Sequence, residues 1–498
     1  MKSAKYFIFL FLIVPYFFVF ASPLQAALPG DTNSDNKVDG LDYVVWLNNY
    51  NRQVSGVNNG DFNADNKVDG LDYVVWLNNY DSTSNYPTIT EPVNNSPTPP
   101  VNVNFLPAFP GAEGFGAVAM GGRGGTVIKV TNLSDSGSGS FRACAEATGP
   151  RNCIFEVSGT ISLADKVSIK NPNLTIAGES SPSPGITLKG APIEIKTSDI
   201  IIRHIRIRVG NQSPVSPSDL DGMAILGPNS KKIIIDHVSI SWAVDENLNT
   251  WYDGVTDVTI SNSIISEALD NSTHPEGPHS KGFLIGDYAK KVALINSVFA
   301  HNYDRHPFLK GGTSSVVLNN LFYNFGQPYG TRLGSTDSSS AGPILTTIQG
   351  NIYIKGPDTS SSSDAVSLST AASGSQWYVN DNKMENVRAG LATNTQTRPI
   401  WFELLTPDPS TNIENQLLLG AGSRPKDRDS VDNRVITEIK NRSGRIIDNP
   451  SDVGGWPTLA QNTRAFPVPA NPNADDDSDG YTNLEELLHQ YASQLSGL

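Results

Sequence analysis

The chain has 498 residues, and its 36 Lys and Arg against 50 Asp and Glu give a formal net charge of −14. This acidic excess excludes most nucleic-acid-binding proteins, because no basic stripe is available to face phosphates. The 38% of hydrophobic residues, 43 Gly and 33 Pro indicate a turn-rich folded protein with disordered connections. At about 150 residues per domain the length predicts about three units, although repeat proteins often break this relation.

Residues 1–26 have the organisation of a secretory signal peptide. Two lysines precede an apolar run from Tyr6 to Phe20, and small and polar residues follow through Ala26. The alternative is a membrane anchor, but the run is shorter than the roughly 20 residues that span a bilayer, and it contains Pro15. The sequence therefore predicts a secreted, extracellular protein without membrane attachment after cleavage.

A twenty-residue segment occurs twice near the start of the chain. Residues 31–50, DTNSDNKVDGLDYVVWLNNY, return at 61–80 as DFNADNKVDGLDYVVWLNNY, with two differences. Oxygen-bearing side chains occupy positions 1, 3, 5, 9 and 12 of each copy, which is the ligand spacing of an EF-hand calcium loop. The candidate Ca²⁺ ligands are Asp31, Asn33, Asp35, Asp39 and Asp42 in the first copy, and Asp61, Asn63, Asp65, Asp69 and Asp72 in the second.

Apolar residues at helical spacing follow each loop, for example Leu41, Val44 and Val45. A calcium loop with one helix, present twice, resembles a dockerin, the module by which secreted bacterial polysaccharide enzymes attach to cohesin domains. The resemblance implies a small α-helical calcium-binding module at residues 27–82 and a cohesin-bearing scaffold protein as partner. A calcium-stabilised spacer without such a partner is the alternative. Residues 83–106, rich in Pro, Thr and Asn, predict an extended linker.

From about residue 127 the chain repeats a short apolar run, a polar step, a second apolar pair and a turn. The polar steps at Arg203, Asp236, Asn262, Asn296, Asn319 and Gly350 are 33, 26, 34, 23 and 31 residues apart. Short strands that return at this spacing predict an all-β fold, a right-handed parallel β-helix, at residues 107–470. A β-sandwich would need hairpin turns, and few Asn-Gly or Asp-Gly pairs separate these strands. The series Asn262, Asn296 and Asn319 predicts a stacked ladder of amides.

Amphipathic helices are expected at both ends of this coil. SFRACAEATG from Ser140 would cover the first turn, and DSVDNRVITEIKNRSG from Asp429 would end at Gly444. Cys144 and Cys153 allow either a disulfide in an oxidising compartment or two reduced thiols, because Cys153 lies on the expected buried face of a strand.

Residues 471–498 predict a third EF-hand-like calcium loop followed by a C-terminal helix. Its candidate ligands are Asp475, Asp477, Asp479, Tyr481, Asn483 and Glu486. We expect this loop to have a structural role.

Acidic residues also flank two neighbouring turns of the expected coil. Asp219 and Asp221 come just before one turn, and Asp245 and Glu246 come just after the next. Stacked turns would bring these four carboxylates within reach of one metal ion. The alternative is that they are solvated loop residues.

Four segments resemble the pectate lyase family of secreted parallel β-helix enzymes. They are FPGAEGFGAVAMGGRGG from Phe109, IIIDHVSISWAVDENL from Ile233, DRHPFLKGG from Asp304, and VDNRVITEIKNRSGRIID to GGWP at 431–457. The resemblance covers residues 107–486 and implies calcium-dependent β-elimination of de-esterified galacturonan, that is, polygalacturonate or pectin. In that reaction a base removes the proton at C5 and the C4 oxygen leaves. A Ca²⁺ ion that bridges enzyme carboxylates to the substrate would neutralise the adjacent uronate.

Residues 305–310 match the family pattern Arg-x-Pro-x-x-Arg, with Lys310 in place of the second Arg. The resemblance implies that Arg305 is the base, and that Lys310 and Lys281 bind substrate carboxylates. Because Arg ordinarily stays protonated, the alternative is that Arg305 stabilises the enolate while another group takes the proton. Trp242, close to the carboxylates in sequence, either stacks on a sugar face or fills the core.

Other functions fit the residues less well. A polygalacturonase hydrolyses its substrate with two carboxyl groups, and neither a Gly-His-Gly nor an Arg-Ile-Lys signature is present. A pectin lyase would act on methylated polymer without calcium, which the acidic cluster disfavours. A non-catalytic galacturonan-binding β-helix is the remaining alternative. The sequence therefore predicts a secreted pectate lyase with a monomeric catalytic domain, joined to a partner by a dockerin-like module.

Overall fold

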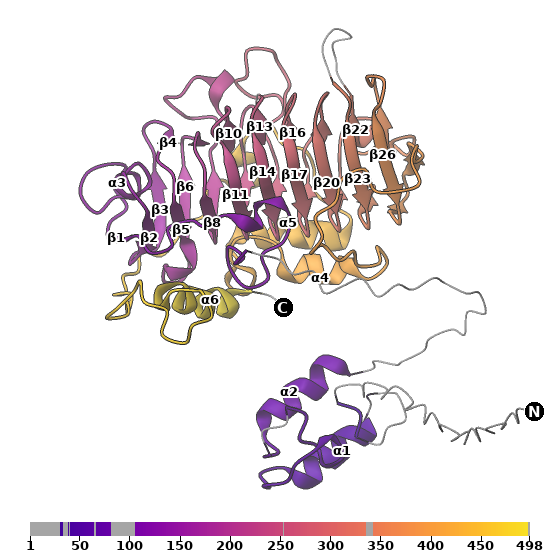
Figure 1. The fold of residues 1–498 in the computed structure, drawn as a ribbon. Coiled ribbons are helices and arrows are strands. Elements are labelled where there is room, and N and C mark those ends of the chain that lie inside the picture. Colours follow the sequence, from indigo (N-terminus) through magenta and orange to yellow (C-terminus); the bar gives the residue numbers. More distant parts are fainter. Residues whose placement is uncertain are drawn as a thin grey trace, which may run out of the picture. The chain divides into compact units, whose positions relative to one another are not determined.

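A computed structural model describes residues 30–32, 38, 40–63, 66–80, 105–251, 253–334 and 342–496. They belong to two units, one within Met1–Pro99 and the other within Pro100–Leu498 (Figure 1). The expected signal peptide at 1–26 and most of the expected linker lie outside the described residues. Across the described ranges, every helix is too short or too polar to cross a membrane.

The first unit contains helices α1 (Gly40–Asn49) and α2 (Gly70–Asn79) and the 3-10 helix η1 (Val57–Asn59). Aromatic side chains from the two copies of the repeat pack together. The ring centroids of Tyr43 and Trp76 are 5.0 Å apart, and those of Trp46 and Tyr73 are 5.1 Å apart. Because α1 and α2 have the same sequence, each helix offers the same two aromatic residues to the other, and the duplication forms one small core.

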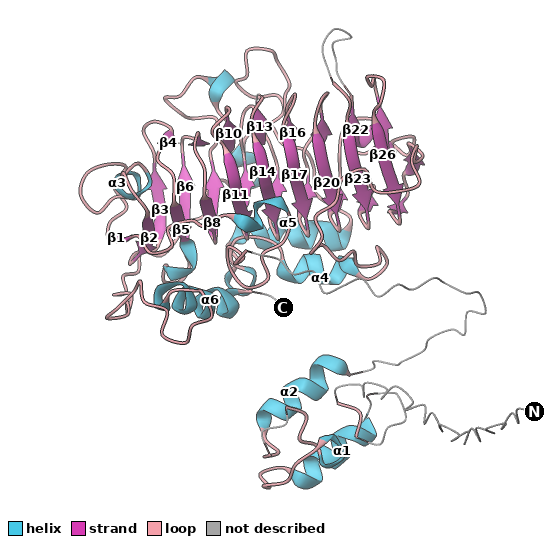
Figure 2. Ribbon diagram, in the orientation of Figure 1, coloured by secondary structure: helices cyan, strands magenta, loops and turns pink. Residues whose placement is uncertain are grey.

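The second unit is a coil of short parallel strands whose turns build three sheets (Figure 2). From β2 to β25 each strand pairs with the strand three places later, as β5 pairs with β8 and β8 with β11. The parallel β-helix expected from the sequence is therefore confirmed.

Sheet 1 consists of β1 (Thr126–Val130), β2 (Arg151–Phe155), β5 (Leu174–Ala177), β8 (Ile200–Arg203), β11 (Lys231–Asp236), β14 (Thr256–Ser261), β17 (Lys290–Ile295), β20 (Ser314–Leu318), β23 (Leu345–Gln349) and β26 (Gln376–Asn380). Sheet 2 consists of β3 (Gly159–Ser162), β6 (Ile186–Lys189), β9 (Ile205–Arg208), β12 (Ser239–Ser241), β15 (Ile264–Ser266), β18 (Val298–Ala300), β21 (Leu321–Tyr323), β24 (Ile352–Ile354) and β27 (Lys383–Glu385). Sheet 3 consists of β4 (Val167–Ile169), β7 (Ile193–Ile195), β10 (Met223–Leu226), β13 (Glu246–Trp251), β16 (Lys281–Ile285), β19 (Phe308–Leu309), β22 (Tyr329–Leu333), β25 (Asp364–Leu368) and β28 (Arg388–Gly390).

Like residues stack on like in the interior of the coil. Ile233 lies opposite Ile200, and Ile235 lies opposite Ile202, and all four are fully buried. Burial of such a side chain contributes about 1.5–3 kcal/mol. The β-branched repeat therefore favours the strand conformation and supplies the core at the same time.

The polar step between sheets 1 and 2 is a single residue with left-handed backbone. His204, His237, Asn262, Asn296 and Asn319 have φ angles of 56°, 49°, 49°, 51° and 55°. Asn and His are enriched in this conformation. The strand register places Arg203 opposite Asp236, and Asp236 opposite Ser261. The sequence alignment of Arg203 and Asp236 with Asn262 is therefore wrong by one residue.

The predicted ladder of Asn262, Asn296 and Asn319 is also wrong, because the ladder forms one residue after the left-handed position. The Asn320 Nδ2 donates to Asn351 Oδ1 at 3.0 Å, and the Asn351 Nδ2 donates to Asn382 Oδ1 at 2.9 Å. Asn320 and Asn351 are fully buried. Buried amides need such partners, which the repeat supplies on successive turns.

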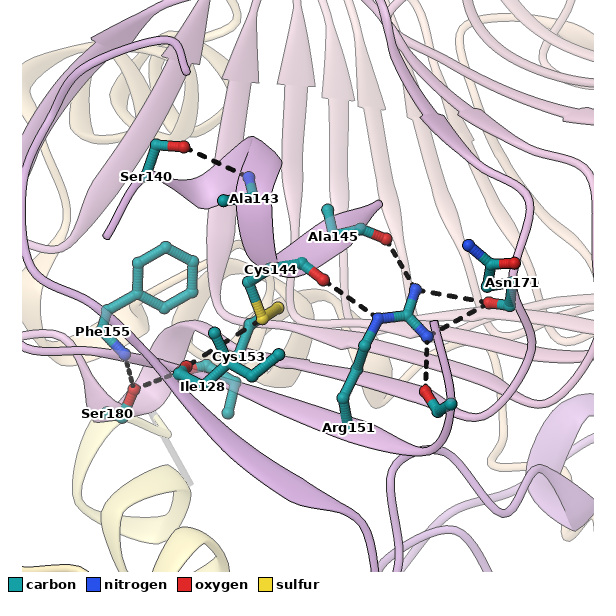
Figure 3. The surroundings of a disulfide bond; sticks show 12 residues. Ile128, Ser140, Ala143, Cys144, Ala145, Arg151, Cys153, Phe155, Asn171 and Ser180 are labelled. Atoms are coloured by element: carbon teal, nitrogen blue, oxygen red, sulfur yellow. Dashed lines mark hydrogen bonds between the residues drawn. A yellow bond between two sulfur atoms is a disulfide. The ribbon is translucent and has the colours of Figure 1, made fainter. Parts of the chain in front are cut away.

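The first turn of the coil is covered by α3 (Phe141–Ala145), which the Ser140 side chain caps. Cys144 of this helix and Cys153 of β2 form a disulfide (Figure 3). The fully buried Arg151 binds the carbonyl oxygens of Cys144 and Ala145 at 3.0 and 2.6 Å. The expected capping helix is therefore present, and of the two alternatives for the cysteines the structure has the disulfide.

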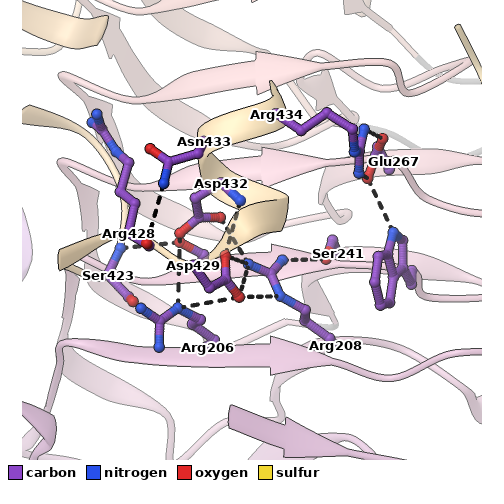
Figure 4. Close-up of polar contacts among 12 residues, drawn as sticks. Arg206, Arg208, Ser241, Glu267, Ser423, Arg428, Asp429, Asp432, Asn433 and Arg434 are labelled. Atoms are coloured by element: carbon purple, nitrogen blue, oxygen red, sulfur yellow. Dashed lines mark hydrogen bonds and ion pairs between the residues drawn. The ribbon is translucent and has the colours of Figure 1, made fainter. Parts of the chain in front are cut away.

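Helices α4 (Ile413–Gly420) and α5 (Ser430–Asn441) pack on sheet 2. Buried Arg208 of β9 lies 2.9 Å from both Asp429, which caps α5, and Asp432 (Figure 4). Burial opposes the charge of Arg208, but the two carboxylates outweigh this effect and raise its pKa.

The expected α5 helix is confirmed, but it ends before Gly444. Arg442 takes the left-handed position at its C-terminus, with a φ of 53°, and its guanidinium binds Glu385 and Glu414. Gly444 instead allows a close approach, since a Cβ there would lie 2.5 Å from a ring atom of His301.

The last helix, α6 (Asn483–Leu495), packs against sheet 1. Leu484 and Leu488 cluster with Ile154 and Ala177. The Thr482 and Glu485 side chains form a capping box at its start. The remaining 3-10 helices are η2 (Phe115–Val118), η3 (Gly178–Ser180), η4 (Pro217–Asp219), η5 (Pro425–Asp427) and η6 (Pro450–Val453).

Candidate active site

A cavity of about 530 Å³ opens on sheet 3, near β10, β13, β16 and β19. Six of the residues singled out in the sequence line it, namely Asp219, Asp221, Asp245, Glu246, Arg305 and Lys310. They come from three turns of the coil, those of β10, β13 and β19. Parallel strands in register bring together residues that are up to 91 positions apart, from 219 to 310.

Three carboxylates meet in this cavity. Asp221, Asp245 and Glu246 each offer an oxygen within 4.8 Å of the others. The β10–β13 register explains the meeting, because Met223 pairs with Leu248 and so brings Asp221 beside Glu246. The backbone N–H of Glu246 donates to Asp221 Oδ1 at 3.1 Å. Asp219 lines the cavity but is not part of this three-residue cluster.

The carboxylate cluster suits a calcium ion. Burial, and next the charge of Asp245, raise the pKa of Asp221 well above its ordinary value. A cation bound beside Asp221 would offset this unfavourable burial of its charge. The Oδ1 atom of Asn249 lines the same place and has no hydrogen-bond partner among the described residues. A set of oxygen donors is what calcium prefers, so these residues fit the ion that the sequence implies.

Arg305 lies beside the carboxylates with a left-handed backbone, at a φ of 66°. Its guanidinium forms an ion pair with Glu246, while its Nε has no hydrogen-bond partner among the described residues. Burial lowers the pKa of Arg305 to about 10, against the opposing effect of Asp245 and Asp221. The side chain is therefore easier to deprotonate than an ordinary arginine.

The two predicted lysines differ in position. Lys310 follows β19, with its Nζ 2.6 Å from Asp287 Oδ2 and 5.1 Å from the ring centroid of Trp251. Lys281 begins β16 in register with Glu246, and its Nζ is 3.7 Å from Asp304 Oδ2. Lys310 lines the cavity, whereas Lys281 is not among the residues that line it.

Trp242 is not available to a sugar, which corrects the substrate-binding alternative. It is fully buried, and its Nε1 donates to Glu267 Oε2 at 3.0 Å. Its left-handed backbone, with a φ of 65°, accompanies this placement in the core. Sequence reasoning missed Asn249 and Trp251, which line the cavity. Their period-two spacing on β13 is the signal that could have identified them.

Two histidines complete the cavity wall. His279 Nε2 lies 3.0 Å from Asp245 Oδ1, and His274 Nε2 lies 3.9 Å from Asp245 Oδ2. Their rings stack with centroids 3.5 Å apart. Burial, and next the neighbouring His279, lower the pKa of His274. The side chain of Asp245 thus faces both the carboxylate cluster and an imidazole pair.

The calcium-type loops of the first unit are described in part. Asp42 and Asp72, at the twelfth position, are fully buried. Asp42 accepts from the Thr32 N–H at 2.8 Å, and Asp72 accepts from the Phe62 N–H at 2.7 Å. Asp31, Asp61, Asn63 and Asp69 are also described, whereas Asn33, Asp35, Asp39 and Asp65 lie outside the described residues. Asp69 caps α2.

In the C-terminal loop, Asp475, Asp477 and Asp479 each place an oxygen within 4.8 Å of the others. Asp475 accepts from the Gly480 N–H at 2.9 Å. Desolvation, together with the aspartates, raises the pKa of Glu486. Tyr481 and Asn483 complete the sequence of the loop, and Asn483 is the first residue of α6.

No family model matches the chain. A probable pectate lyase C of Aspergillus flavus is 33% identical over 418 residues, which covers 76% of this chain and 93% of that protein. A probable pectate lyase C of Aspergillus fumigatus is 32% identical over 421 residues, covering 77% of this chain and 93% of the relative.

Among solved structures, Jun a 1, the major allergen from cedar pollen, aligns with a TM-score of 0.50 at 20% identity. The alignment covers 61% of this chain and 91% of the allergen, and it supports the fold. The sequence relatives show the family as well as the fold, because they are more than 30% identical over most of both chains. The chain belongs to the pectate lyase family of polysaccharide lyases.

Proposed function

We propose that the protein is a secreted, calcium-dependent pectate lyase that cleaves de-esterified galacturonan by β-elimination. The observation that carries this proposal is the placement of Arg305 against the Asp221, Asp245 and Glu246 cluster in one cavity. Family membership supports the reaction class. The acidic cluster favours calcium chemistry on a substrate that is itself a polyanion, because uncompensated carboxylates would repel it.

The carboxylate cluster, Arg305 and the two lysines each have a role in the proposed reaction. A calcium ion held by the three carboxylates would neutralise the uronate and make the C5 proton more acidic. Arg305 accepts that proton, because burial has already lowered its pKa to about 10. Lys310 binds a substrate carboxylate as a point charge, next to Trp251. Lys281 supports the site through Asp304, in register with Glu246.

Two readouts on purified full-length protein test the proposal with polygalacturonate and, in parallel, with methylated pectin. β-Elimination produces an unsaturated uronate, which is followed by its ultraviolet absorbance, together with new reducing ends. We expect both signals on polygalacturonate in the presence of calcium. Reducing ends without absorbance would mean a hydrolase, and binding without either signal would mean a non-catalytic protein. Activity confined to methylated pectin would mean a pectin lyase.

We propose further that the N-terminal unit is a dockerin-like module that binds a cohesin-bearing scaffold. Exposed apolar side chains on both helices support a docking role, because such residues are seldom left exposed together without a partner. They include Leu47, Leu71, Val74 and Leu77, which are 51%, 63%, 48% and 51% exposed. Titration calorimetry with a cohesin domain should show calcium-dependent binding, weakened by the double substitution of Leu47→Asp and Leu77→Asp. Binding that survives chelation would contradict this role.

Secretion follows from the proposed signal peptide at 1–26. Mass spectrometry of the exported chain should find a new N-terminus close to residue 27. An intracellular full-length chain would contradict the proposal.

The C-terminal loop has a structural role in this account. Calcium bound by Asp475, Asp477 and Asp479 would fix the start of α6, whose leucines cover sheet 1.

A further inference from the structure

The cavity has a second half whose donors are nitrogen atoms. His274 and His279 belong to the loop between β15 and β16, and both direct Nε2 toward Asp245, at 3.9 and 3.0 Å. One donor atom from each of the three residues lies within 4.8 Å of the others. The two imidazole rings stack with their centroids 3.5 Å apart. Uncharged imidazole is the form that binds metals.

We propose that His274, His279 and Asp245 form a second metal site, which takes a divalent cation of the zinc class. Imidazole nitrogen favours zinc, cobalt and nickel, whereas calcium prefers oxygen donors. The two halves of the cavity therefore select different ions, and Asp245 is their shared ligand. This inference goes beyond the proposed lyase activity and does not depend on it, because metal binding is measured without substrate.

A second group of two histidines and an aspartate lies elsewhere in the coil, but its carboxylate is less accessible to a metal ion. His204, Asp236 and His237 also bring their donor atoms together, between sheets 1 and 2. There the Nε of Arg203 already lies 3.1 Å from Asp236 Oδ2, so a cation of the protein itself pairs with the carboxylate. His204 is also fully buried. In the cavity, by contrast, the side chain of Asp245 is 19% exposed and open to an entering ion.

Metal binding requires one local rearrangement. The backbone N–H of Glu276 donates to His274 Nδ1 at 3.2 Å. A metal on Nε2 leaves the proton of the neutral ring on Nδ1, so this long hydrogen bond must break. Because Asp245 is shared, an ion held by the histidines also withdraws a ligand from calcium. Zinc-class ions should therefore weaken calcium binding in the cavity.

Cobalt titration of the full-length protein tests the site. Co²⁺ is added in the presence of calcium, which fills the oxygen-only loops, and its visible d–d absorption is recorded. Because calcium competes for Asp245, the titration is continued until the Co²⁺ signal saturates, and it is repeated at a lower calcium concentration. We expect one equivalent of Co²⁺ to bind and Zn²⁺ to displace it. His274→Gln and His279→Gln should each lower the affinity for Co²⁺ by at least tenfold. The matched control is His489→Gln, which removes an imidazole that packs against Tyr481 outside the cavity and should leave binding unchanged.

Absence of the d–d absorption in the wild-type protein would overturn the proposal, and so would equal Co²⁺ affinity in wild type and both cavity variants. Circular dichroism establishes that each variant is folded. If a variant is not folded, the site is tested in the wild-type protein by NMR, because bound Co²⁺ should broaden the ring signals of the two histidines. Sharp His274 and His279 signals with Co²⁺ present would then overturn it. Lyase activity is assayed separately. A protein without lyase activity could therefore still bind Co²⁺ at this site, and the two proposals are tested independently.

Discussion

Single backbone conformations decide which side chains reach the active site. Trp242 and Arg305 both have left-handed backbone, at φ of 65° and 66°. The first is buried beside Glu267, while the second reaches the cavity carboxylates. Neither conformation is visible in a strand pattern, because such positions depend on the surrounding packing. The sequence therefore predicted which residue types form the site, but it could not place the tryptophan.

Substitution of Arg305 by lysine should remove most of the lyase activity. Loss of a general base lowers kcat by about 10²–10⁴-fold, and the shorter ammonium cannot restore the same geometry. The matched control is Arg388→Lys on β28, where the side chain is 63% exposed and pairs with Asp364. Initial rates of unsaturated uronate formation measure both variants. Equal rates in Arg305→Lys and wild type would exclude Arg305 as the base.

The pH dependence separates the two possible roles of Arg305. Since burial lowers its pKa to about 10, the neutral fraction grows about tenfold per pH unit below that value. A base should therefore give a kcat that rises with pH toward 10. A guanidinium that only stabilises the enolate would instead lose activity as the pH approaches 10. A plot of log kcat against pH, at saturating calcium and substrate, shows whether Arg305 acts as the base or as a charged stabiliser of the enolate.

Glu179 gives a pH dependence of stability. Burial raises the pKa of its carboxyl from 4.5 to about 7, and Arg203 only partly offsets this effect. The folded state therefore keeps a proton that the unfolded chain releases, so stability falls as pH rises from 4.5 to about 7. The loss is about 3 kcal/mol in order of magnitude. Glu179→Gln should raise the thermal midpoint at pH 8 and leave it nearly unchanged at pH 4. An equal gain at both pH values would contradict this.

At the scale of elements, the repeat predicted the strands better than their junctions. Apolar runs such as Ile233–Ile235 identify a buried strand, because their periodicity reflects the core directly. The junction is harder, since the left-handed residue and the ladder residue are neighbours, as in Asn319 and Asn320, and both are asparagine. Residue type alone therefore cannot distinguish an asparagine with left-handed backbone from one whose side chain forms a hydrogen bond to the next coil of the β-helix.

Asn351→Ala tests the corrected ladder. It removes donors to Val317 and Gln349 and an acceptor for Asn320, all in the interior. Buried polar groups left without partners cost about 1–3 kcal/mol, so we expect a loss of at least this size in urea unfolding. The control is Asn296→Gly at the left-handed position, where glycine adopts the same backbone without strain. A larger loss for Asn296→Gly than for Asn351→Ala would contradict the assignment.

At the scale of the molecule, one acidic chain combines a duplicated segment, which carries α1 and α2, with a parallel β-helix. The sequence predicted the β-helix, because a repeat is visible without any structure. Calcium binding by the duplicated segment stays a prediction. Of the four carboxylates that the sequence predicted to lie together, Asp221, Asp245 and Glu246 do so, because of the β10–β13 register, and Asp219 does not join them. The sequence did not predict that His274 and His279 meet Asp245, because a loop between strands has no periodicity from which to infer contacts.

The central claim is that calcium in the cavity, and not only in the loops, is required for β-elimination. The most direct measurement is the initial rate of unsaturated uronate formation against calcium concentration, for wild type, Asp221→Asn and Asp475→Asn. The account predicts no activity in chelator and a half-saturating calcium concentration about tenfold or more higher in Asp221→Asn. Asp475→Asn, which alters only the C-terminal loop, should match wild type. Activity that persists in chelator, or the same calcium dependence in all three proteins, would contradict it.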